Sequence, residues 1–460
     1  MNKFVFFLKH AMSRAVSLLY FSFAFLSAVV ADDVAWMKTE LPVGASFTFA
    51  TGVGEYMVDW GDGVEVTLTS TGDPVTGMLA GQTVKLSGVS IDVLTCKGQQ
   101  LTALDFSSGS QLAVLDCSDN SLTALNLLNQ SKLTMLDCSD NHISSLRLPT
   151  GKTLEVLIAS RNELKSLQLS SGMKTIWVDG NQLSKLALGA QAQVESVVFD
   201  DNDVSTLTLP AAMPQLTDFW MAGNHLSQLK MGNCPLLETV NVEDNGMWNF
   251  EMGSQESERV LKQAFLGGNH FTLANLLPAT MVEKFYPGEQ MEWPTEKEVY
   301  EVGDTIVFPD MTVNVHTNAR MAPVYKLVAS NGTVLAKNKD YTYGASRLDS
   351  HIMKFLVSQS LLIHLEATSN VYPGVIIKSV PFKVVEHTTG IDHTKLPTGQ
   401  QNSMTIENDG TGLVITTQGS IPITVVGNGG QLCWKGVVDG RQRIPLRRGV
   451  YVVNGRKIAL

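Results

Sequence analysis

The chain has few of the residues from which enzyme and metal sites are usually built. Among its 460 residues are five cysteines and nine histidines, and no Cys-x-x-Cys or Cys-x-x-His spacing occurs, so neighbouring positions offer no zinc ligand set. Gly-x-Ser-x-Gly, His-Glu-x-x-His and phosphate-loop motifs are also missing. The sequence therefore predicts no catalytic residue, no cofactor and no metal, and we expect a protein that is not an enzyme.

The chain also has no excess of basic residues. With 34 Lys and Arg against 44 Asp and Glu, its net charge of −10 gives no basic footprint for nucleic acid. After Ala31 there is no long apolar run, so we expect no transmembrane span in the mature chain. The odd number of cysteines argues against a complete disulfide framework in an exported protein.

The segment 1–31 has the three parts of a secretory signal peptide. Lys3, Lys9 and Arg14 make the start positive, an apolar run follows from Ala15, and "VVA" ends at Ala31. This order predicts cleavage after Ala31 and export of residues 32–460. An uncleaved membrane anchor is the alternative, because the run is nearly long enough to span a bilayer.

One phrase recurs at a nearly constant interval through the first half of the chain. "LDCSDN" at 115–120 returns at 136–141 and continues with drift, as in "IWVDGN" at 176–181. Each copy ends in an asparagine that we expect to be buried and to satisfy backbone groups at a turn. Together with Gln99 before them and Asn269 after them, these asparagines predict about nine coils over 88–278. The asparagines are Asn120, Asn141, Asn162, Asn181, Asn202, Asn224 and Asn245.

The phrase fits L-x-x-L-x-L-x-x-N-x-L, which resembles the leucine-rich repeat family. A 21-residue coil cannot bury its apolar face alone, but stacked coils share one continuous core. A second phrase such as "LTALNL" at 122–127 fills the other half of most coils, and no stretch is long enough for a helix. We expect a parallel strand on one side of each coil and an extended segment on the other.

Three cysteines occupy one position of this repeat. Cys96, Cys117 and Cys138 follow one another at exact multiples of the repeat period, and the same position later holds Ala159 and Val178. Because a free cysteine behaves as a small buried hydrophobe, we interpret the column as core rather than as a metal or redox site. This ladder resembles the 21-residue repeats of internalin J-type bacterial surface proteins.

In a leucine-rich repeat, the residues between the core leucines face outward on the concave side. Here they predict an aromatic strip bordered by acidic residues, and an exposed apolar patch of this kind usually marks an interaction site. The alternative is that neighbouring outward side chains only pack on one another. The predicted ligand-binding residues are Met135, Asp137, Ile158, Arg161, Trp177, Asp179, Val198, Asp200, Asp201, Trp220 and Phe265.

Other segments flank the repeats. Residues 32–87 read as a β-rich N-terminal cap, 279–294 as a linker, 295–386 as an immunoglobulin-like β-sandwich, and 387–402 as a second linker. The tail, 403–460, reads as a small β domain and resembles the C-terminal sorting domain of type IX secretion, although an ordinary β cap is the alternative. The matching residues are Gly449, Tyr451, Val453, Lys457 and Ile458.

The fold class expected is therefore mainly β: a leucine-rich repeat solenoid, a β-sandwich and a small C-terminal β domain. This order resembles internalin J-like surface proteins of Bacteroidota. The resemblance implies secretion across the outer membrane and attachment to the cell surface, with roles in adhesion, biofilm or host contact. It implies a protein or glycan ligand on host or bacterial surfaces, and secretion machinery as a second partner. A passive spacer or coat protein is the alternative.

Overall fold

A computed structural model describes residues 33–88, 91–107, 111–189, 193–252, 261–343, 351–386, 404–408, 412–417, 420–427, 432–446, 450–453 and 456–459. The predicted signal peptide, 1–31, lies outside these ranges. Within them the chain forms strands β1 to β38 and one short 3-10 helix, η1 (Ala279–Met281). No helix among these residues is long and apolar enough to cross a membrane.

An N-terminal cap continues both faces of the solenoid. Strands β4 (Glu65–Ser70), β3 (Gly54–Asp59), β6 (Thr83–Gly88), β1 (Asp33–Thr39) and β8 (Leu101–Phe106) form one antiparallel sheet. Strand β2 (Ser46–Thr51) pairs with β5 (Val75–Met78) and then with β7 (Val93–Thr95), the first strand of the solenoid. In the "WGDG" turn, Asp59 Oδ1 accepts hydrogen bonds from the backbone N–H groups of residues 61, 62 and 63, which gives this carboxylate a turn-closing role.

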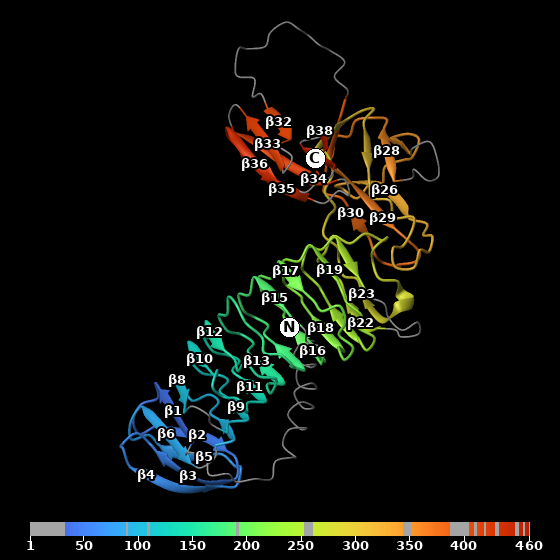
Figure 1. The fold of residues 1–460 in the computed structure, drawn as a ribbon. Coiled ribbons are helices and arrows are strands. Elements are labelled where there is room, and N and C mark those ends of the chain that lie inside the picture. Colours follow the sequence, from blue (N-terminus) through green and yellow to red (C-terminus); the bar gives the residue numbers. More distant parts are fainter. Residues whose placement is uncertain are drawn as a thin grey trace.

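The coils stack into one long parallel sheet (Figure 1). Because the strands pair in register, each coil position lies beside the same position of the next coil; Leu136, for example, pairs with Leu115 and Leu157. This register confirms the predicted mainly-β solenoid and its coil length. After β7 the strands of this main sheet are β9 (Val114–Asp116), β11 (Met135–Asp137), β13 (Val156–Ile158), β14 (Thr175–Trp177), β16 (Ser196–Val198), β18 (Asp218–Trp220), β20 (Thr239–Asn241), β22 (Leu261–Phe265) and β23 (Val282–Tyr286).

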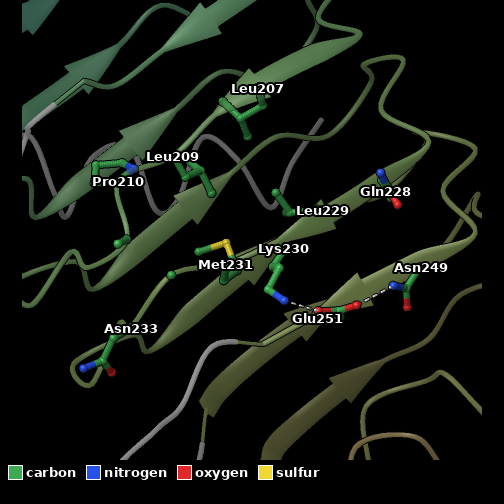
Figure 2. A pocket seen from close by; sticks show the side chains of 12 residues that line it. Leu207, Leu209, Pro210, Gln228, Leu229, Lys230, Met231, Asn233, Asn249 and Glu251 are labelled. Atoms are coloured by element: carbon green, nitrogen blue, oxygen red, sulfur yellow. Dashed lines mark hydrogen bonds and ion pairs between the residues drawn. The ribbon is translucent and has the colours of Figure 1, made fainter.

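The opposite side of the described coils carries short two-stranded sheets in place of helices. Their pairs are β10 (Ala124–Asn126) with β12 (Ser145–Arg147), β15 (Lys185–Ala187) with β17 (Thr206–Thr208), and β19 (Gln228–Lys230) with β21 (Asn249–Glu251). Between the second and third pairs lies a hollow of about 640 Å³, with Leu207, Met231 and the Lys230–Glu251 ion pair among its lining (Figure 2).

The asparagine ladder ties each coil to the preceding one. Asn141 Nδ2 donates to the carbonyls of Cys138 and Ser139 in its own coil, at 3.2 and 3.1 Å, and to that of Cys117 in the preceding coil, at 3.0 Å. Its Oδ1 accepts from the N–H of Leu122, at 2.9 Å. The pattern repeats at Asn120, Asn162, Asn181, Asn202, Asn224, Asn245 and Asn269. One amide group thus satisfies four backbone groups away from water.

The segment 279–294 is not the linker that we predicted from the sequence. Its strand β23 pairs with β22 in parallel, so it adds a coil to the main sheet. Gln290 lies one repeat after Asn269 and takes the ladder position: its Nε2 donates to the carbonyls of Leu266 and Pro287, and its Oε1 accepts from the N–H of Phe271. The prediction missed this coil because "FYPGEQ" has no asparagine at the ladder position and contains Pro287 and Gly288, which are typical of a linker.

Residues 299–385 form a second β domain around the rings of Tyr300, Phe355 and Phe382. Its described residues, 299–343 and 351–385, form three small sheets, in strand orders β24-β31, β25-β28-β27 and β26-β29-β30. Its immunoglobulin-like type stays a prediction. The strands are β24 (Val299–Glu301), β25 (Thr305–Val307), β26 (Val324–Ala329), β27 (Tyr341–Tyr343), β28 (Ile352–Phe355), β29 (Ile363–Thr368), β30 (Ile377–Lys378) and β31 (Lys383–Val385).

This domain seals the last coil of the solenoid. The Tyr372 hydroxyl and Asn314 Nδ2 both donate to the carbonyl of Leu276, at 3.1 and 3.0 Å. The N–H of Val315 donates to the carbonyl of Ala274, and the two domains share one continuous apolar core. A solenoid needs a cover over its terminal coil, and the second domain supplies it.

The C-terminal module has a separate core that includes Leu413, Ile423 and Val453. Its strands form two sheets, in orders β32-β33-β36 and β35-β34-β37-β38. They are β32 (Met404–Asn408), β33 (Gly412–Thr417), β34 (Ile421–Gly427), β35 (Leu432–Val438), β36 (Arg441–Pro445), β37 (Val450–Val453) and β38 (Arg456–Ala459).

Candidate binding face of the main sheet

The thiols face the core and not this surface. Cys96, Cys117 and Cys138 have no exposed surface and form no disulfide. Burial raises the pKa of each of the three thiols, with smaller contributions from neighbouring acids, and a thiol that stays protonated is a poor nucleophile and metal ligand. The described residues also contain no group of three His, Cys, Asp or Glu placed to hold a metal ion.

We therefore expect Cys96, Cys117 and Cys138 to react with a soluble disulfide reagent at least about 100-fold more slowly in the native protein than in denaturant. Mass spectrometry of the labelled peptides measures each site separately. Cys433, which is half-buried, serves as the internal control for reagent activity. Rapid native labelling of the three column cysteines would instead restore the redox interpretation.

The outer face of the main sheet is set by strand alternation. In β11 the side chain of Leu136 enters the core, so the side chains of Met135 and Asp137 point to the other face. The same alternation places Ile158, Trp177, Val198, Trp220 and Phe265 in one outward column across β13 to β22. Sequence periodicity thus predicted the side to which these residues point.

The centre of this column is packed, which differs from the exposed strip that we predicted. Met135, Val156, Ile158 and Trp177 form a small apolar cluster, separate from the solenoid core, and Trp177 exposes only 6% of its surface. The indole Nε1 of Trp177 donates to Ser196 Oγ at 3.1 Å. Large side chains on neighbouring strands stand opposite one another and bury each other's flanks. The packing alternative therefore describes Met135, Ile158 and Trp177 better than exposure does.

In the part of the column nearest to the second domain, the side chains are less buried and most of them are aromatic. Val198, Trp220 and Phe265 are half-buried, and Tyr286 is 37% exposed. The rings of Trp220 and Phe265 have centroids 5.9 Å apart, and those of Phe265 and Tyr286 are stacked at 4.6 Å with 3° between their planes. We call Trp220, Phe265 and Tyr286 the aromatic ladder. Tyr286 is not among the residues predicted from the sequence, because residues 279–294 read as a linker. The alignment of "FYPGEQ" with "AFLGGN" is the signal that indicates it.

The acidic residues beside the column differ in burial. Asp137, Asp179 and Asp200 each expose less than a tenth of their surface, whereas Asp201 is exposed. Asp137 Oδ1 accepts from the N–H and hydroxyl of Ser139, and Asp179 accepts from the hydroxyl of Ser160. Burial raises the pKa of both carboxyl groups. Asp137 thus stabilises its own turn and Asp179 joins its coil to the preceding one.

The position before each ladder asparagine requires a left-handed backbone. Its φ is 57° at Asp119, 54° at Asp140, 53° at Arg161, 54° at Asp201 and 53° at Asp244. Glycine fills this position in other coils, and aspartate tolerates it better than most residues. The four aspartates follow the main-sheet strands and form what we call the acidic ridge. Arg161 interrupts it and is bound to Asp140, with Asp179 3.7 Å from its guanidinium.

Asp200 makes stability depend on pH. Burial, together with the charges of Asp179, Asp201 and Glu243, raises the pKa of Asp200 to about 7, against the single opposing bond from the N–H of Ala222. The folded protein thus holds a proton that the unfolded chain releases near pH 4. The contribution of Asp200 to stability is therefore greatest below about pH 4, falls as pH rises towards 7, and stays lower above it.

We expect Asp200→Asn to flatten this decline and to raise the free energy of unfolding at pH 8 by about 2 to 4 kcal/mol. Urea titrations at pH 4, 6 and 8 measure both effects. Asp119→Asn is the matched control, since Asp119 is exposed, has the same left-handed backbone and lies several coils away from Asp200. Parallel pH curves for the parent protein and Asp200→Asn would contradict the assignment.

The residues of the predicted sorting signal lie at the end of the C-terminal module. Tyr451 and Val453 are buried residues of β37. Lys457 and Ile458 belong to β38, which pairs antiparallel with β37 and places Ile458 beside Tyr451. Gly449 lies outside the described residues. The structure thus brings four of the five residues together on one terminal hairpin.

No protein-family model matches this chain, and no curated protein does. Among solved structures it is similar to YopM, a leucine-rich effector protein from Yersinia pestis, with 24% identity over 39% of this chain and 56% of YopM, at a TM-score of 0.31. It is similar to the functional domain of InlJ from Listeria monocytogenes, which includes a cysteine ladder, with 13% identity over 67% and 94% of the two chains and a TM-score of 0.24. It is also similar to InlP of Listeria monocytogenes, with 14% identity over 60% of this chain and 74% of InlP, at a TM-score of 0.35. The chain thus spans little more than half the length of YopM.

Proposed function

We propose that this protein is an exported, internalin-like surface protein that binds a protein or glycan through the outer face of its main sheet. The aromatic ladder is the observation that carries the proposal. Three aromatic side chains gather at one end of the outer face of the main sheet, and none of them belongs to the solenoid core. Tryptophan and tyrosine are favoured binding residues because they bury a large area at small entropic cost.

The packed cluster changes which variants test the proposal. Trp177 is nearly buried, so replacing it with alanine is expected to destabilise the fold and confuse the result. Trp220 and Tyr286 are more accessible. We expect the full chain with Trp220→Ala and Tyr286→Ala to remain folded and to lose at least about tenfold in affinity for host-cell or bacterial surfaces.

The control for this experiment is Trp36→Ala, because Trp36 is a 39% exposed tryptophan in the cap. Circular dichroism of each variant verifies its folding. If the folded double variant bound cells as the parent does, the outer face would not be the binding surface. A passive spacer or coat protein, which the packed centre of the column favours, would then be the better description.

Export is the second part of the proposal. The composition of residues 1–31 supports entry into the secretory pathway, and the tail motif supports sorting to the cell surface. Fractionation of cells that make the full chain, or a chain without residues 388–460, separates these steps. We expect the shortened chain to leave the cytoplasm but to be absent from the surface; unchanged surface display would remove the sorting role.

A further inference from the structure

The two rings at the end of the aromatic ladder show which class of ligand suits it. The centroids of Phe265 and Tyr286 are 4.6 Å apart and their planes differ by 3°. Rings that lay flat on the sheet, side by side, could not have centroids so close, so the two rings overlap face to face. Their edges, and not their shared faces, therefore point away from the sheet.

This orientation bears on the choice between a sugar and a protein. A sugar binds an aromatic platform by laying one face of its ring on the face of the aromatic ring. The shared faces of Phe265 and Tyr286 are covered by each other, and one side of Phe265 is turned towards Trp220, whose plane is tilted by 33°. Ring edges still pack well against aliphatic and aromatic side chains. The geometry thus favours the apolar side chains of a protein segment.

Charge supplies a second and independent observation. The exposed ridge residues Asp201 and Asp244 follow β16 and β20, the two strands that flank β18, which carries Trp220. Glu289 is exposed in the last coil, shortly after Tyr286. Within the ladder strands, on the side away from the ridge, the charges are mixed: Lys284 of β23 is exposed, and Lys262 of β22 is paired to Glu238. The negative potential is therefore on one side of the ladder.

We propose that the aromatic ladder and the adjacent acidic ridge bind a protein segment that places apolar side chains against the ring edges and Lys or Arg side chains against Asp201 and Asp244. An apolar centre beside charged groups is the usual composition of a protein–protein contact. Opposite charges across the rim mainly increase the association rate and select the partner. This inference rests on the proposed binding function and specifies its partner.

The test uses the full chain and two sets of probes. A phage-displayed random dodecapeptide library is selected on the immobilised protein, and the protein is applied separately to cellulose, chitin and mannan. We expect enriched peptides to carry an aromatic or aliphatic residue close to Lys or Arg, and the three polysaccharides to bind no protein. Affinity for the peptides should fall at least about tenfold in Tyr286→Ala. In the parent protein, the affinity for the peptides should fall as the salt concentration rises. It should fall less in the double variant Asp201→Asn, Asp244→Asn.

Matched variants make the result specific. Trp36→Ala controls for loss of an exposed ring, and Glu55→Gln controls for loss of an exposed charge in the cap; both variants should bind the peptides as the parent does. Enriched peptides without basic residues, or peptides whose binding survives Tyr286→Ala, would overturn the inference. Polysaccharide binding that Tyr286→Ala abolishes would overturn the protein partner and leave the proposed function intact. If the ladder variants leave cell-surface binding unchanged, both the proposed function and this inference are wrong.

Discussion

Replacing Asn141 with alanine is expected to destabilise the protein by about 3 to 5 kcal/mol. The amide of Asn141 satisfies three carbonyls and one N–H at a position that exposes only 6% of the residue. Alanine removes all four bonds and leaves the backbone groups away from water, where each unsatisfied group costs about 1 to 3 kcal/mol before the structure relaxes. Urea unfolding at neutral pH measures the loss.

Asn126→Ala is the matched control for this prediction. Asn126 lies on the opposite side of the neighbouring coil, is exposed, and accepts one long bond of 3.4 Å from the N–H of Leu128. Its replacement should change stability by less than about 0.5 kcal/mol. Asn141→Asp keeps the acceptor and removes the donor, so it separates the two contributions. A cost below about 1 kcal/mol for Asn141→Ala would mean that the ladder is not a main source of stability.

Removing the second β domain is expected to have the larger effect. A chain ending at residue 290 keeps every coil but exposes Phe271, Leu273 and Leu276, which are now buried at 0 to 1% exposure. It also loses the bonds from Asn314 and Tyr372 to the last coil. We expect this chain to aggregate, or to unfold at least about 10 °C below a chain ending at residue 386. Calorimetry and light scattering compare the two.

The chain ending at residue 386 is itself the control, because it removes only the module that has a separate core. A point variant tests the same contact without truncation: Asn314→Ala in the full chain should destabilise the last coil, since it leaves the Leu276 carbonyl with one fewer donor. If the chain ending at 290 proved monomeric and equally stable, the second domain would be a spacer and not a cap.

Period and polarity allowed much of this fold to be predicted. The regular spacing of the asparagines gave the coils, and the apolar residues that follow Cys138 in its column gave the buried side of the strands, because both depend on local alternation. The coil at 282–290 was missed because its ladder position holds no asparagine and its Pro287 and Gly288 are typical of a linker. The fit between Tyr372 and Leu276 could not be predicted, since it joins residues 96 positions apart that share no motif.

The sequence predicted to which face the side chains of the candidate site point, but not how exposed these side chains are. Alternation told which side chains leave the core, but burial on the outer face depends on the sizes of neighbours across several strands. Trp177 and Trp220 occupy the same column, yet Trp177 lies within an apolar cluster with Ile158 and Val156, whereas Asn241 follows Trp220 on the next strand. The acidic border was visible in the sequence, but its link to a left-handed backbone position needed the φ angles.

The asparagine ladder has a consequence for how such a chain can change its length. Each ladder asparagine bonds within its own coil and to one neighbouring coil, as Asn162 does with Ala159 and Cys138. A duplicated or deleted coil would therefore bring or remove a complete set of bonds and leave the two capped ends untouched. Unequal recombination between copies could lengthen the outer face in steps of about 4.8 Å, and with it the number of contacts available to a ligand.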